Sequence, residues 1–119
     1  MIISQSLEAW QESMQLVYQI YQLIPSQSEL SFNLKLKQTA NAISHRLTES
    51  ISKNSYKCYS YNLNYANALV IELQTQLKLA TNTNNMHPTD YAILSERSVI
   101  IQNSIFKVLK RINEIENNH

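Results

Sequence analysis

Apolar side chains recur along most of the chain at alternating intervals of three and four residues. The first such stripe consists of Leu7, Trp10, Met14, Val17, Tyr21 and Ile24. This alternation keeps apolar side chains on one face of a helix and is typical of helices in bundles. The stripe therefore predicts a helix over residues 6–24, with Ser6 as its N-cap. Pro25 ends the helix, because the residue before a proline disfavours the α region.

A second stripe predicts a helix over residues 27–53. Its apolar positions are Phe32, Leu36, Ala40, Ile43, Leu47 and Ile51. Ser26 and Glu29 have the spacing of a capping box, which places the start of this helix close to Pro25. Asn54 is a suitable stop, because asparagine tolerates the left-handed region better than most residues.

The third helix is predicted over residues 55–81, with Ser55 as its N-cap. Its main stripe consists of Tyr59, Leu63, Ala66, Val70, Leu73, Leu77 and Ala80. A second, partly polar face carries Tyr61, Tyr65, Leu69, Gln76 and Leu79. A helix with two such faces contacts more than one neighbour, which predicts that copies of the chain associate.

Residues 81–87 form a polar loop, and Pro88 then occupies the first turn of a fourth helix, predicted over residues 88–116. Its stripe consists of Tyr91, Leu94, Ser98, Ile101, Ile105, Val108, Ile112 and Ile115. Four helices with short connections favour a single domain over residues 1–119. We expect an all-α, antiparallel up-down-up-down four-helix bundle.

The composition excludes several kinds of site. The 119 residues include no glycine, two prolines and one cysteine. Phosphate-cradling loops, dinucleotide fingerprints and nucleophile elbows all require glycine, as do the favoured β-hairpin turns. No run of about 18 apolar residues is present, so no bilayer span is expected. The lone cysteine and the lack of a secretory signal favour a cytoplasmic location.

The charge is nearly balanced overall but locally basic. Ten Lys and Arg stand against nine Asp and Glu, a net charge of +1, which gives little support for tight non-specific binding to nucleic acid. Residues 31–60 hold five of the cations and one carboxylate, Glu49, a local charge of +4. This segment favours an anionic partner. The predicted nucleic-acid or partner-binding residues are Lys35, Lys37, Arg46, Lys53, Lys57 and Tyr56.

Four of the seven tyrosines are clustered in the sequence, namely Tyr56, Tyr59, Tyr61 and Tyr65. Interleaved with Lys53 and Lys57, they could stack on bases beside phosphate contacts. The alternative is that Tyr59 lies in the core and the other three lie at subunit interfaces, where tyrosine is enriched. We favour the second interpretation.

Residues capable of catalysis or metal binding do not form a recognisable set. His45 and Glu49 have helical spacing and could be a ligand pair, but a solvated histidine beside a carboxylate is the favoured interpretation. Cys58 has no companion for a zinc site, and its neighbour Lys57 is expected to point elsewhere on the helix. We expect no metal, no cofactor and no enzymatic activity.

Several stretches resemble one family over roughly residues 6–115. They are Trp10 with Gln11, residues 23–25, Ile43 with Glu49, Ser55, Lys57, the run 72–80 and Tyr91, of which the run 72–80 is the most specific. Together they resemble the four-helix-bundle proteins encoded in intervening sequences of 23S ribosomal RNA genes. That family is related to the accessory variability determinant proteins of diversity-generating retroelements.

The resemblance implies a homopentameric barrel of four-helix bundles without catalysis. The retroelement proteins bind a reverse transcriptase and nucleic acid through basic surface. The family's basic pair in the second helix falls on Lys37 and Gln38, so one charge is kept. The basic turn after that helix falls on Lys53, Asn54, Tyr56 and Lys57, so about half of its charge is kept.

Two glycine positions of the family pattern fall on Ser50 and Asn84. The second helix should therefore continue smoothly through Ser50 to about Lys53, while Asn84 can still adopt a positive φ. We expect an oligomeric accessory protein that binds a reverse transcriptase and its RNA or DNA. The alternative is a structural or protein-interaction module with no nucleic-acid role.

Overall fold

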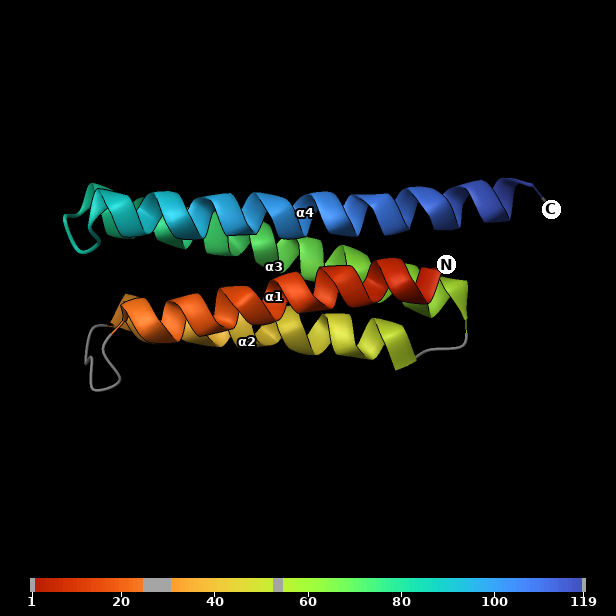
Figure 1. The fold of residues 1–119 in the computed structure, drawn as a ribbon, viewed down its shortest axis with the longest axis horizontal. Coiled ribbons are helices and arrows are strands. Elements are labelled where there is room, and N and C mark those ends of the chain that lie inside the picture. Colours follow the sequence, from red (N-terminus) through yellow and green to blue (C-terminus); the bar gives the residue numbers. More distant parts are fainter. Residues whose placement is uncertain (1, 25–30, 53–54, 119) are drawn as a thin grey trace.

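The computed structural model describes residues 2–24, 31–52 and 55–118. These residues form four helices and no strand: α1 (Ile2–Leu23), α2 (Ser31–Ser52), α3 (Tyr56–Asn82) and α4 (Pro88–Asn117). The helices lie side by side along the longest dimension of a 51 × 21 × 18 Å molecule (Figure 1). The prediction of an all-α fold with four helices is confirmed.

Each helix packs against two others. α2 lies between α1 and α3, and α4 contacts the same two helices, so the four enclose one core. In Figure 1 the chain runs along α1 from the end marked N to the opposite end and returns along α2, and it does the same along α3 and α4. Two seams therefore lie on opposite sides of the molecule, the α2/α3 seam and the α1/α4 seam.

The core stripes of α3 and α4 are confirmed. All seven stripe positions of α3 are buried, and so are the six of α4 from Leu94 to Ile112. The α2 stripe is buried from Leu36 to Leu47, but its last position is taken by Ser50 rather than by Ile51, which is half-buried. Ser50 Oγ donates to the Leu47 carbonyl oxygen at 2.7 Å, which satisfies its hydroxyl inside the core.

The core stripe predicted for α1 is wrong by one position in every member except Ile24, which is buried as predicted. The buried side chains are Ser6, Ala9, Ser13, Leu16, Ile20 and Ile24. The predicted stripe instead faces α2, and two of its members, Leu7 and Tyr21, are 41% and 50% exposed. Met14 Sδ accepts a hydrogen bond from Ser44 at 3.1 Å, and Tyr21 Oη accepts one from Asn41 at 3.0 Å.

This error has a geometric cause. One residue turns a helix by about 100°, and the arc of α1 that faces the rest of the bundle contains both stripes, of which the buried one includes the polar Ser6 and Ser13. The spacing pattern identifies the arc but does not say which edge faces the bundle axis. The small side chains of Ala9 and Ser13 sit at that axis, and the larger Trp10 and Met14 pack sideways.

Ser6 is not the N-cap of α1. The helix begins at Ile2 and Ser6 lies inside it, because no proline or other breaker precedes it. The predicted capping box of Ser26 and Glu29 and the predicted stop at Asn54 lie outside the described residues.

The other helix boundaries agree with the sequence. Ser55 caps α3, with its Oγ accepting from the Cys58 amide at 3.3 Å, and Pro88 occupies the first turn of α4. His87 was not predicted as the N-cap of α4, but its Nδ1 accepts from the Thr89 amide at 3.1 Å. Ser50 is helical and Asn84 has a φ of 59°, both as expected. Within the described ranges, no helix has the length and apolarity needed to cross a membrane.

Candidate functional site

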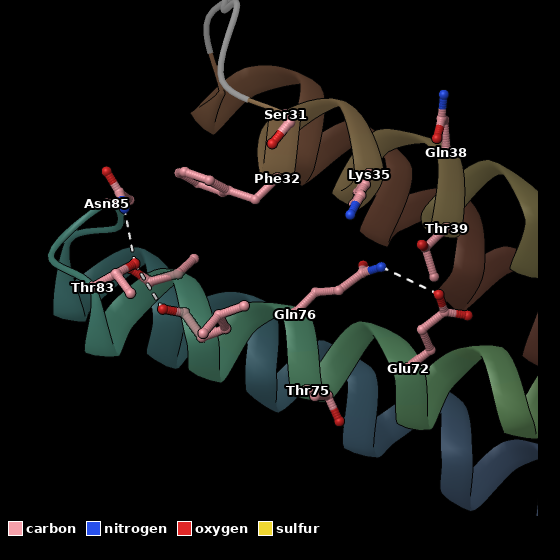
Figure 2. Close-up of a pocket in the computed structure, with 12 residues that line it drawn as sticks. Ser31, Phe32, Lys35, Gln38, Thr39, Glu72, Thr75, Gln76, Thr83 and Asn85 are labelled. Atoms are coloured by element: carbon pink, nitrogen blue, oxygen red, sulfur yellow. Dashed lines mark hydrogen bonds between the residues drawn. The ribbon is translucent and has the colours of Figure 1, made fainter.

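Two surface grooves follow the α2/α3 seam. The first, of about 610 Å³, joins the last turns of α2 to the first turns of α3; we call it the arginine groove. It is lined by His45, Arg46, Glu49, Lys57, Cys58, Tyr61 and Asn62. The second, of about 770 Å³, joins the start of α2 to the end of α3 and is lined mainly by amide, hydroxyl and apolar groups; we call it the amide groove (Figure 2).

Arg46 is held in place by two neutral groups. Its guanidinium carbon lies 3.9 Å from the centre of the Tyr65 ring, and Nη1 donates to Asn62 Oδ1 at 3.3 Å. Asn62 is buried and is itself fixed, because its Nδ2 donates to the Cys58 carbonyl oxygen at 2.9 Å. The ring and the amide are both neutral, so neither of these contacts places a carboxylate against the guanidinium.

The predicted pair of His45 and Glu49 forms a loose contact. Their Nε2 and Oε1 atoms are 3.9 Å apart, and the His45 side chain is largely exposed. Among the described residues, no group of three or more His, Cys, Asp or Glu is placed to hold a metal ion. Cys58 is an exposed free thiol. Lys57 and Cys58 both line the arginine groove.

The tyrosine cluster divides into one core residue and three surface residues. Tyr59 is buried, as one of the two interpretations predicted, and its hydroxyl has no hydrogen-bond partner in the described part of the chain. Burial, and secondarily the neighbouring Tyr56, raises the pKa of Tyr59 to about 12. Tyr56, Tyr61 and Tyr65 are exposed, and the rings of the last two lie 6.2 Å apart with a 59° tilt.

The predicted binding residues do not form one cluster. Arg46 and Lys57 meet at the arginine groove, whereas Lys35 lies in the amide groove, about 17 Å away along α2. Lys37 faces α1, with its Nζ 5.2 Å from the centre of the Tyr21 ring. Tyr56 is exposed but does not line either groove.

Lys53, the remaining predicted residue, lies outside the described residues. The structure adds three residues that were not among the predicted binding residues, Tyr61, Tyr65 and Asn62. Tyr61 and Tyr65 have the i, i+4 spacing that places two side chains on one face of a helix. This spacing predicts that their rings are neighbours. The contact of Arg46 with α3 has no such signal, because it depends on how two helices pack.

The amide groove has a different chemistry. Figure 2 shows Phe32 and Lys35 projecting from α2 toward α3, and Gln76 reaching back from α3. Gln76 Nε2 donates to Glu72 Oε1 at 3.4 Å, while its Oε1 is buried without a partner among the described residues. Glu72 offsets the charge of Lys35, so this groove offers less attraction to an anion than the arginine groove does.

Comparisons with known proteins agree on the family and the fold. A family model described as "23S rRNA-intervening sequence protein" matches residues 5–114. A crystal structure from Bacteroides thetaiotaomicron, described as a protein with unknown function from the S23 ribosomal protein family, has a TM-score of 0.81 and 17% identity. That match covers 89% of this chain and 98% of the other, and at this identity it shows the fold alone. The comparison with curated proteins found no match.

Proposed function

The chain belongs to the 23S rRNA-intervening sequence protein family, and on this premise we propose that it is a non-enzymatic, oligomeric accessory protein that binds RNA or DNA across its α2/α3 seam. The observation that carries this proposal is the arginine groove. There Arg46 is fixed on Tyr65, and Lys57 supplies a second cation from the facing helix. Cations and exposed aromatic rings on one surface are the features with which proteins bind nucleic acid strands.

The low net charge limits the strength of this binding but does not oppose it. Counterion release scales with the number of phosphates that a protein neutralises, not with its total charge. The arginine groove holds two cations, a histidine and one carboxylate, Glu49. We therefore expect binding of moderate affinity that is strong only at low salt.

The nucleic-acid half is tested by titrating a labelled RNA hairpin with the protein at increasing salt and measuring fluorescence anisotropy. The logarithm of the affinity should fall linearly with the logarithm of the salt concentration. Arg46→Gln and Lys57→Gln should each weaken binding and reduce that slope by about 1. Lys110→Gln, which removes an exposed cation from α4, is the matched control and should leave both values unchanged. Absent or salt-independent binding would contradict the proposal.

We further propose that the protein serves a reverse transcriptase, as its resemblance to retroelement accessory proteins implies. The gene should then lie beside a reverse transcriptase gene and a repeat pair. Co-expression of the tagged chain with that enzyme should recover both in one complex after nuclease treatment. A gene located alone within a ribosomal RNA operon, with no reverse transcriptase nearby, would argue against this part.

The oligomer is proposed to be a pentamer of up-down-up-down bundles. Its support is the apolar surface that a single chain leaves exposed, including Ile71 on α3 and Val99 and Phe106 on α4, each between 46% and 49% exposed. Apolar side chains that form a contiguous patch mark interfaces, and the proposed pentamer would bury these three. Sedimentation equilibrium should give about 69 kDa, five chains of 13.8 kDa, whereas a 13.8 kDa particle at micromolar concentration would exclude self-association.

The same apolar surface supports a second candidate, a protein-interaction module with no nucleic-acid role. It predicts that the purified protein carries no RNA or DNA and that the hairpin does not bind even at low salt. Substitution of Val99 or Phe106 by Asp would then abolish partner binding, while Arg46→Gln would have no effect on it. The anisotropy titration distinguishes the two candidates directly.

A further inference from the structure

Tyr61 is the most exposed of the large apolar and aromatic side chains on the described surface, at 61%. It lies on the wall of the arginine groove rather than on an isolated stretch of helix. Its ring leans on Tyr65, with the ring centres 6.2 Å apart. A tilted pair at this separation is a favourable arrangement, so Tyr65 supports the Tyr61 ring from one side.

Tyr65 in turn carries Arg46. The guanidinium carbon lies 3.9 Å from the Tyr65 ring centre, and its hydrogen bond to the buried Asn62 fixes its position. Arg46, Tyr65 and Tyr61 thus form a row of three planar groups, which we call the ladder. The guanidinium lies over the Tyr65 ring, and the Tyr61 ring is tilted by 59° to that ring. The ladder is built on two packed helices and not on loops, so its geometry is set before any ligand arrives.

The groove beside this ladder suits a single nucleotide unit. Its volume of about 610 Å³ falls in the range of pockets that hold small ligands. Lys57 and His45 line it together with Arg46, so a phosphate could meet positive charge within reach of the Tyr61 ring. Glu49 also lines the groove, and its carboxylate disfavours a second phosphate there.

We propose that this ladder binds an unpaired nucleotide of a single strand, with the base stacked on Tyr61 and the adjoining phosphate held by Lys57 and Arg46. The inference rests on the proposed nucleic-acid function and specifies its ligand. A base inside a duplex is already stacked on both faces and cannot reach the ring, whereas an unpaired base can. Because every base has an aromatic face, the site should be tolerant of sequence.

The test compares a short labelled oligoadenylate with an RNA duplex of the same length by fluorescence anisotropy. Wild-type protein should prefer the single strand. Tyr61→Leu keeps an apolar side chain but removes the ring, and it should weaken single-strand binding on the order of tenfold while duplex binding stays unchanged. Tyr61→Phe keeps the ring and should bind the single strand as tightly as wild-type protein does. Tyr18→Leu, which replaces an exposed tyrosine of α1 that is 54% exposed, should change neither affinity.

Arg46→Gln tests the proposed function separately from this inference. It should weaken binding of both the single strand and the duplex, because it removes a phosphate contact and not a stacking surface. If Tyr61→Leu weakens both probes equally or neither, the ladder is not a stacking site, although the proposed function still stands. If wild-type protein binds neither probe at low salt, the proposed function itself fails. If Tyr61→Leu lowers the mass measured by sedimentation, Tyr61 belongs to an interface between copies of the chain, and the inference is overturned.

Discussion

Arg46 at the α2/α3 seam and Arg97 at the α1/α4 seam are held in opposite ways. Arg97 of α4 is bonded to the carboxylate of Glu12 of α1, and its Nε donates to Gln19 Oε1 at 3.3 Å. Arg46 of α2 is held by a ring and an amide. A carboxylate offsets a guanidinium charge and neutral partners do not, so the positive charge of Arg97 is balanced by its partner and that of Arg46 is not balanced by the ring and amide that hold it.

A protein with a net charge of +1 can still place two cations on one groove, as Arg46 and Lys57 show. At the α1/α4 seam the charges of Arg97 and Glu12 pair with each other, and both side chains are about one-quarter exposed. At the α2/α3 seam the fixed cation faces a groove that also contains Lys57. The α1/α4 and α2/α3 seams therefore differ in what holds each arginine, a carboxylate in one and neutral groups in the other, and not in their number of charges.

The largest effect should come from the core that both seams share. Leu73 of α3 is fully buried, and Leu73→Ala should lower the free energy of unfolding by about 2–5 kcal/mol, as lost transfer energy and a cavity combine. Urea denaturation followed by circular dichroism measures this. RNA affinity of the folded fraction should stay within twofold of wild type; a much larger loss would mean that the groove depends on core packing more than on Arg46.

Replacing Arg97 and Arg46 by glutamine, one at a time, tests whether the two arginines have different roles. Arg97→Gln leaves the carboxylate of Glu12, about one-quarter exposed, without its guanidinium and should lower the free energy of unfolding by about 1–2 kcal/mol with unchanged RNA affinity. Arg46→Gln should cost less than about 1 kcal/mol of stability but weaken RNA binding. Urea denaturation measures the free energy of unfolding of each variant, and fluorescence anisotropy measures its RNA affinity. Equal effects of the two variants on both measurements would show that the seams do not differ.

Glu49→Gln removes the carboxylate that lines the arginine groove. RNA affinity should rise about two- to fivefold at low salt, and the gain should shrink as salt increases, because the interaction is exposed and screened. Glu114→Gln on α4 is the control, since its carboxylate pairs with Arg111 and lies away from the groove. A fall in affinity after Glu49→Gln would indicate that Glu49 positions His45 rather than repelling the ligand.

Tyr59→Phe should have the smallest effect at pH 7, within about 0.5 kcal/mol, because the buried hydroxyl has no hydrogen-bond partner among the described residues. The pH dependence is more telling. The pKa of Tyr59 is raised from 10.0 to about 12 in the folded protein, so between these values the unfolded chain loses a proton that the folded chain keeps. This contribution to stability is present below pH 10 and lost toward pH 12. Urea denaturation across that interval should show a shallower loss for Tyr59→Phe, and identical slopes would refute the assignment.

The sequence was a good guide wherever one helix face decides the outcome. The stripes of α3 and α4, the N-cap at Ser55, the first-turn position of Pro88 and the positive φ of Asn84 all follow from local spacing and residue type. It misled in α1, because the stripe that faces the axis contains Ser6 and Ser13 and is less apolar than the neighbouring stripe that was predicted. Only packing against α2 and α4 settles that choice.

The candidate site was predicted in composition more than in arrangement. Local charge and tyrosine content pointed to the segment that contains Arg46 and Lys57, and this prediction needed no structure. The sequence treated Lys35, Lys37 and Arg46 alike, yet α2 directs them to three different surroundings. It also had no means of placing Arg46 on Tyr65, since these residues are 19 positions apart and on different helices.

What the sequence alone determined was the helical class, the helix count and most of the core, because helix period and capping are properties of neighbouring residues. The family followed from short stretches of the chain and was confirmed by the match over residues 5–114. What only the tertiary structure decided was which charges face carboxylates and which face rings. That difference between Arg97 and Arg46 arises when separate helices come together, and it is the basis of the proposed binding face.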